Sequence, residues 1–69
     1  GQAVAASAEP EAVEAARRAF REGRARYDAG DHEAALQHFR ESLASFASPN
    51  TQLYEARCLR ALGQLPEAL

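Results

Sequence analysis

The sequence predicts an all-α protein built from antiparallel helix–turn–helix hairpins, as in a fragment of an α-solenoid. Three successive segments carry apolar residues at spacings of three and four, which places those side chains on one face of an α-helix. Glycines follow the first and third segments, at Gly30 and Gly63, where a helix can end. Sliding the sequence by 33 residues pairs these two glycines and also pairs Leu36 with Leu69. A helical hairpin that recurs at this interval is typical of solenoid repeats.

The first expected helix spans about residues 10–29 and opens a helical domain over residues 9–69. Residues 1–8 show no amphipathic period, so we expect a disordered or frayed extension there. Pro10 suits the first helical turn, where a backbone N–H would have no partner. Gly30 ends the helix because glycine adopts a left-handed conformation without a steric penalty. One face of this helix carries a stripe of mostly small side chains: Ala12, Ala16, Ala19, Phe20, Gly23 and Tyr27.

The second expected helix spans about residues 31–47, begins with Asp31 as its cap and carries the strongest amphipathic stripe in the chain. We expect burial of the members of that stripe, which are His32, Ala35, Leu36, Phe39, Leu43 and Phe46. Pro49 is expected to stop this helix, because the residue before a proline is pushed out of helical geometry. A third helix is expected over about residues 51–62, followed by a truncated fourth over residues 64–69.

Small, aromatic and turn residues at fixed places in the repeat indicate a family. They are Gly23, Ala25, Tyr27, Gly30, Asp31, Ala35, Leu36, Phe39, Leu43 and Pro49. This pattern resembles the tetratricopeptide repeat (TPR) of bacterial type, with one full repeat and the first helix and turn of a second over about residues 15–69. The sequence departs from the family at Ala19, where a bulky aromatic is usual, and at His32 and Leu65, where tyrosine is common. Ser42 replaces a late alanine, and Pro49 comes about two positions late. The resemblance implies a TPR-like α-solenoid fragment whose concave surface is lined by the first helix of each repeat.

The middle of the first expected helix is rich in arginine. The five arginines there are Arg17, Arg18, Arg21, Arg24 and Arg26. The resemblance places some of them on the concave surface beside aromatic residues. The candidate peptide-binding residues are Arg17, Phe20, Arg21, Arg24, Tyr27, Tyr54, Arg57 and Arg60. Arginine forks suit carboxylates, and the aromatic rings can hold apolar side chains of a peptide. The other interpretation is that these arginines are solvated or paired with neighbouring carboxylates.

These observations support two hypotheses about function. The first is a protein-interaction module that binds an acidic or C-terminal peptide segment on the concave face. The alternative is a structural solenoid fragment with no ligand of its own, which forms homo-oligomers through unpaired repeat faces. A nucleic-acid partner is not expected, because the net charge is −2. The style of the repeat favours a bacterial cell-envelope or periplasmic protein over a cytoplasmic one.

No residue pattern predicts an enzyme, a metal site or a cofactor. His32 and His38 are six residues apart, which places them on different faces of a helix, unlike the i, i+4 spacing of a helical metal pair. Cys58 takes the place of Ala25 in the repeat, so we expect a small packing residue rather than a reactive thiol. Membrane insertion is not expected either, since no apolar run approaches the roughly 20 residues that a spanning helix needs.

Overall fold

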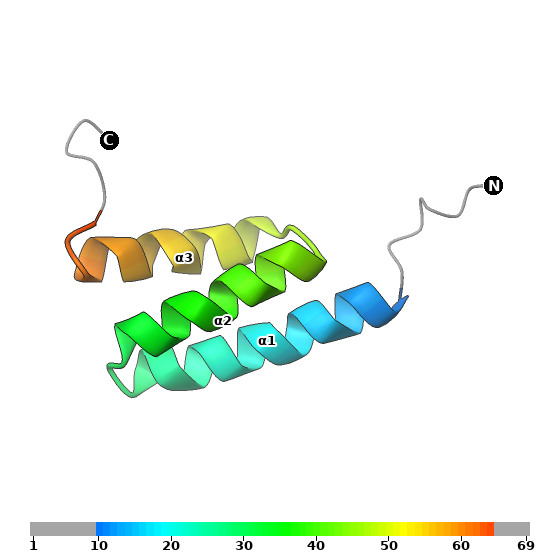
Figure 1. Ribbon diagram of the computed structural model, residues 1–69, viewed down its shortest axis with the longest axis horizontal. Helices are drawn as coiled ribbons and strands as arrows, with labels where there is room; N and C mark the ends of the chain where they lie inside the picture. Colours follow the sequence, from blue (N-terminus) through cyan, green and yellow to red (C-terminus); the bar gives the residue numbers. More distant parts are fainter. Residues whose placement is uncertain (1–9, 65–69) are drawn as a thin grey trace.

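A computed structural model describes residues 10–64 of the 69-residue chain as three α-helices in antiparallel order (Figure 1). Helix α1 (Pro10–Asp28) packs against α2 (His32–Ser45), and α2 packs in turn against α3 (Pro49–Ala61). This arrangement confirms the all-α fold class and is consistent with a fragment of a helical-hairpin repeat. The extension expected over residues 1–8 lies outside the described residues, as does the expected fourth helix beyond Gln64.

The turn between α1 and α2 forms where the sequence predicts it, at Gly30 and Asp31. Gly30 has a φ of +87°, a left-handed conformation that side chains disfavour. The Asp31 N–H donates to the Arg26 carbonyl oxygen at 2.9 Å, and the Asp31 side chain accepts from the Ala34 N–H at 3.1 Å. Gly63 follows α3 with a φ of +71°. Both turns therefore follow from the backbone preferences of the residues that form them, which can be predicted from the sequence.

The junction between α2 and α3 differs from the prediction. Helix α2 ends at Ser45, and α3 begins at Pro49, two residues before its predicted start. Ser48 is extended, with φ −133° and ψ 134°, which is the conformation that a following proline imposes. Pro49 then occupies the first turn of α3, where its missing N–H costs nothing. The proline thus begins the third helix as well as separating it from the second.

The core is centred on Phe39, which has no exposed surface. Ala35, Leu36 and Cys58 are buried beside it. Phe20, Tyr27, Tyr54, Leu59 and Leu62 are partly buried and pack against this group. Phe46, which was expected to be buried with the α2 stripe, is 42% exposed. It lies beyond the last residue of α2 and has extended geometry, so it no longer follows the buried face.

Gly23 lets α1 approach α2 closely at the Phe39 ring. A Cβ built on Gly23 would lie 2.6 Å from Cε1 of Phe39, closer than real carbon atoms pack. The small side chain in the middle of the α1 stripe is therefore required by packing, and the aromatic ring fills the space beneath it.

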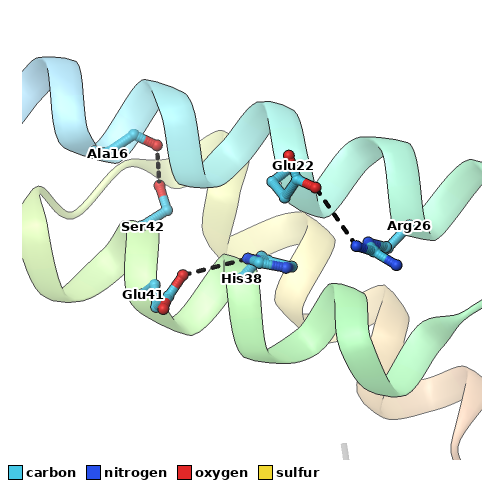
Figure 2. A network of polar contacts seen from close by, with 6 residues as sticks. All are labelled: Ala16, Glu22, Arg26, His38, Glu41 and Ser42. Atoms are coloured by element: carbon cyan, nitrogen blue, oxygen red, sulfur yellow. Dashed lines mark hydrogen bonds and ion pairs between the residues drawn. The ribbon is translucent and has the colours of Figure 1, made fainter.

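Ser42 joins α1 to α2 through a buried hydrogen bond that the sequence reading did not predict. Its hydroxyl donates to the Ala16 carbonyl oxygen at 2.8 Å, and Ser42 is only 2% exposed (Figure 2). This hydrogen bond satisfies the buried hydroxyl and restrains the distance between the two helices at this point.

Replacing Ser42 with alanine is expected to lower the free energy of unfolding by about 1 kcal/mol, the typical net value of such a bond. Urea unfolding followed by circular dichroism measures this change. Ser45→Ala is the control, because Ser45 is exposed in the last turn of the same helix and shares the small gain in helix propensity. Equal stability of the two variants would show that the hydrogen bond contributes nothing.

Candidate functional site

Two arginines from different helices lie against one aromatic ring. The guanidinium carbon of Arg24, on α1, is 4.8 Å from the centroid of the Tyr54 ring on α3. The guanidinium carbon of Arg57, also on α3, is 5.0 Å from the same centroid. These distances are those of cation–π contacts. We call Arg24, Tyr54 and Arg57 the Arg–Tyr–Arg cluster.

Neighbouring aromatic rings hold Tyr54 in place. Its ring centroid lies 5.2 Å from that of Tyr27 and 5.6 Å from that of Phe20, in edge-to-face geometry. Phe39 supports it from the core at 5.5 Å. Such contacts stabilise the ring beyond simple burial, so the two arginines share a platform with a fixed orientation. The Tyr27 ring also contacts His32 at 5.3 Å, which shows this histidine packed at the α1–α2 turn.

The arginines of the cluster keep charge available on the surface. Nη2 of Arg24 lies 3.5 Å from Oδ2 of Asp28, but both side chains are well exposed, and such pairs are weak. Nε of Arg24 is buried and has no hydrogen-bond partner in the described part of the chain. Arg57 is exposed and forms no ion pair within residues 10–64.

Two further arginines are paired with carboxylates away from the cluster. Arg26 lies 3.7 Å from Glu22 on α1, and Arg40 of α2 lies 3.3 Å from Glu55 of α3. Ion pairing describes Arg26 and Arg40 and, weakly, Arg24.

A groove lies beside the cluster, between the first half of α1, the end of α2 and the beginning of α3. Its volume is about 340 Å³. We call it the α1–α3 groove, and its lining residues are Val13, Ala16, Arg17, Phe20, Arg21, Ser42, Phe46, Ser48, Asn50 and Thr51. The groove therefore combines apolar side chains, from Val13, Phe20 and Phe46, with polar ones and with two exposed arginines.

The structure divides the candidate peptide-binding residues among three places. Phe20, Tyr27 and the Arg–Tyr–Arg cluster lie together. Arg17 and Arg21 line the α1–α3 groove, to which Phe20 also contributes. Arg60 is exposed in the last turn of α3 and belongs to neither group.

Sequence reading missed several groove residues, including Val13, Phe46, Ser48 and Thr51. The Ser48-Pro49 pair is a known signal for a helix start, and it could have located the beginning of α3 beside the groove. No comparable signal in the sequence indicates that Thr51 is buried, although it is only 4% exposed.

A second hollow on the α1–α2 surface has a different character. It is lined by small residues and mixed charges, and they are Ala15, Arg18, Ala19, Glu22, His38, Glu41, Ala44 and Ser45. Three of its polar groups form contacts: Nδ1 of His38 lies 3.3 Å from Oε1 of Glu41, and Glu22 pairs with Arg26 (Figure 2). Two glutamates and one arginine line this hollow, so it offers less attraction to an acidic partner than the α1–α3 groove, which is lined by Arg17 and Arg21.

The remaining groups with reactive or metal-binding chemistry are Cys58 and the histidines and carboxylates of residues 10–64. Cys58 is buried, and burial, followed by the negative charge of Glu55, raises the pKa of its thiol. A raised pKa keeps the sulfur protonated and weakly nucleophilic. No group of three possible metal ligands gathers in the described residues. None of the described helices has the length and apolar character needed to cross a membrane.

Comparisons with protein-family models, with curated proteins and with solved structures found no match to this chain. The tetratricopeptide resemblance therefore stays a prediction from the repeat pattern.

Proposed function

We propose that this chain is a protein-interaction module that binds an acidic peptide segment on the face shared by α1 and α3, within a bacterial TPR-type repeat protein. The observation that carries the proposal is the convergence of Arg24 and Arg57 on one ring, Tyr54. A guanidinium stacked on a ring keeps its N–H groups in the plane, where they can donate to a carboxylate in a forked pair.

The surrounding charge supports an acidic partner. Arg17 and Arg21 are exposed on the same side of α1 as Arg24, at spacings of three, four and seven residues. Asp28 is the carboxylate paired with this group, and its contact is solvent-exposed and weak. At least two arginines, Arg24 and Arg57, can therefore bind a peptide carboxylate. Because the surface is small, we expect roughly micromolar binding that weakens as salt screens the charges.

A variant with both cluster arginines reversed, Arg24→Glu with Arg57→Glu, tests this proposal. Fluorescence anisotropy with a labelled acidic peptide is expected to show at least about tenfold weaker binding, because attraction becomes repulsion. The matched control is Arg18→Glu with Arg26→Glu, which makes the same change in net charge at exposed positions outside the cluster. We expect that control to bind within about twofold of the unmodified protein.

Equal weakening in both double variants would contradict the proposal, because it would show a response to net charge alone. Retained affinity in the cluster variant would contradict it as well. Circular dichroism of each variant establishes that the helices are still formed.

The alternative function is structural, with self-association as its mechanism. The observation that favours it is Leu53 on α3, a large apolar side chain that is 46% exposed. In a solenoid, the next helix covers such a residue. Analytical ultracentrifugation distinguishes the two functions, because the alternative requires a dimer or larger species at high protein concentration. A monomer across the whole concentration range would exclude it.

A further inference from the structure

The hollow on the α1–α2 surface, which we call the α1–α2 hollow, can take one face of a further helix. Its lining residues come from two helices that run antiparallel side by side (Figure 1). Small side chains line it on both helices: Ala15 and Ala19 on α1, and Ala44 and Ser45 on α2. Such side chains let the backbone of another helix approach closely. The volume of the hollow is about 610 Å³, against about 340 Å³ for the α1–α3 groove, so it is wide enough for more than one side chain.

Exposed charged residues of alternating sign border this hollow. They recur every four residues on α1, so they share one side of the helix, and they are Glu14, Arg18, Glu22 and Arg26. We call them the α1 charge stripe. Arg18 and Glu22 line the hollow itself. Within the molecule the stripe is weakly paired: Glu22 lies 3.7 Å from Arg26 in an exposed contact (Figure 2), and Arg18 forms no ion pair within residues 10–64.

The α1 charge stripe is complementary to itself in one antiparallel register. Read forwards the signs are minus, plus, minus, plus, and read backwards they are reversed at every place. A second α1 that runs antiparallel, with the two-fold axis at the level of Phe20, places Arg18 opposite Glu22 of the second copy and Glu14 opposite Arg26 of the second copy. A shift of four residues in either direction places like charges opposite each other. The stripe therefore favours this register over its neighbours.

We propose that the α1–α2 hollow is an interface with a second copy of this chain. The α1 helix of the second copy lies antiparallel to α1 and covers the small side chains of the hollow, and two-fold symmetry repeats the contact. Among the described residues, the lining of the hollow shares none with the Arg–Tyr–Arg cluster or with the α1–α3 groove. The dimer therefore leaves the proposed peptide-binding face open, and it does not involve Leu53, on which the alternative function rests.

The dimer is expected to be weak and sensitive to salt. Exposed ion pairs contribute little each, and added salt screens them. The other charged groups that line the hollow, His38 and Glu41, lie 3.3 Å apart and partly satisfy each other. We therefore expect a dissociation constant of roughly millimolar at low salt, with the chain monomeric at micromolar concentrations.

Two single charge reversals and their mixture test the proposal, with sedimentation equilibrium of the full chain at low salt as the measurement. Arg18→Glu alone and Glu22→Arg alone each place like charges at the two central contacts, so each is expected to weaken the dimer at least about fivefold. An equimolar mixture of the two variants restores opposite charges at both contacts. We expect the mixture to associate within about twofold of the unmodified protein. A response to net charge alone predicts the reverse for Glu22→Arg, which changes the formal net charge from −2 to 0.

Two control variants separate this interface from other contacts. Arg60→Glu makes the same change in net charge as Arg18→Glu at an exposed position on α3, and Leu53→Ala removes the exposed leucine of α3. Both are expected to dimerise within about twofold of the unmodified protein. A monomeric unmodified protein at millimolar concentration and low salt would overturn the proposal. A mixture that associates no more tightly than either single variant would overturn it too, and loss of the dimer in Leu53→Ala would assign the contact to α3 instead.

Discussion

Replacing Gly23 with valine is expected to remove a large part of the free energy of unfolding of the protein. A Cβ at this position would lie 2.6 Å from Cε1 and 2.8 Å from Cδ1 of Phe39. The ring has no exposed surface and contacts Phe20 and Tyr54, so it has little space into which to move. Overpacking a core costs about 1–3 kcal/mol per event, and valine adds three carbons. A core this small supplies about 3–5 kcal/mol of stability in total.

Thermal unfolding followed by circular dichroism measures this effect. Ala25→Val is the control, because Ala25 is exposed on the same helix and the change reports only the lower helix propensity of valine, about 0.5 kcal/mol. Gly23→Ala should be destabilised to a smaller degree. The double variant Gly23→Ala with Phe39→Leu should recover part of the lost stability, since a side chain at position 23 occupies space that the Phe39 ring fills. A cooperative transition in Gly23→Val close to that of the unmodified protein would contradict the packing described here.

Replacing Phe39 with alanine is the second change with a large expected effect. Phe39 is fully buried on α2 and is in ring contact with Phe20 and Tyr27 from α1 and Tyr54 from α3. Deleting a buried phenylalanine side chain typically costs about 3–5 kcal/mol, through lost burial and the cavity left behind. That loss equals most of the stability of a domain of this size.

The chain contains no tryptophan, so near-ultraviolet circular dichroism of its tyrosines, with urea as denaturant, is the appropriate measurement. Phe39→Ala is expected to lose the signal of ordered tyrosine packing before any urea is added. Phe46→Ala is the matched control, because it deletes the same side chain at a position that is 42% exposed, and we expect a loss below about 1 kcal/mol. Similar losses in both variants would show that Phe39 does not hold the three helices together.

The parts of the fold that depend on local backbone chemistry could be predicted from the sequence. Gly30 and Gly63 both adopt positive φ angles, and Asp31 caps α2 through its side chain, as the residue types indicate. The α1 stripe containing Phe20, Gly23 and Tyr27 also packs against the core, because helical spacing alone decides which side chains share a face.

The parts that depend on how the helices pack against one another and on where α2 ends could not be predicted. Ser42 and Thr51 are polar and nearly fully buried, and no periodic pattern distinguishes them from exposed polar residues. Phe46 belongs to the apolar pattern yet leaves the core, because α2 ends at Ser45, the residue before it.

The Arg–Tyr–Arg cluster could be predicted only in part. The 33-residue register places Arg24 and Arg57 at equivalent positions, so their sharing of a surface is predictable. The same register aligns Tyr54 with Arg21, and nothing in that alignment indicates that Tyr54 lies against both arginines. Three-dimensional packing of the aromatic rings is needed to see the cluster.

A backbone-amide NMR titration of the full chain with an acidic peptide, at low and then at physiological salt, tests the central claim most directly. Acidic-peptide binding at the Arg–Tyr–Arg cluster predicts shifts gathered on Arg24, Tyr27, Tyr54 and Arg57 that diminish as salt is added. An unchanged spectrum, shifts gathered instead around His38 and Glu22 on the other face, or general line broadening from self-association would contradict it.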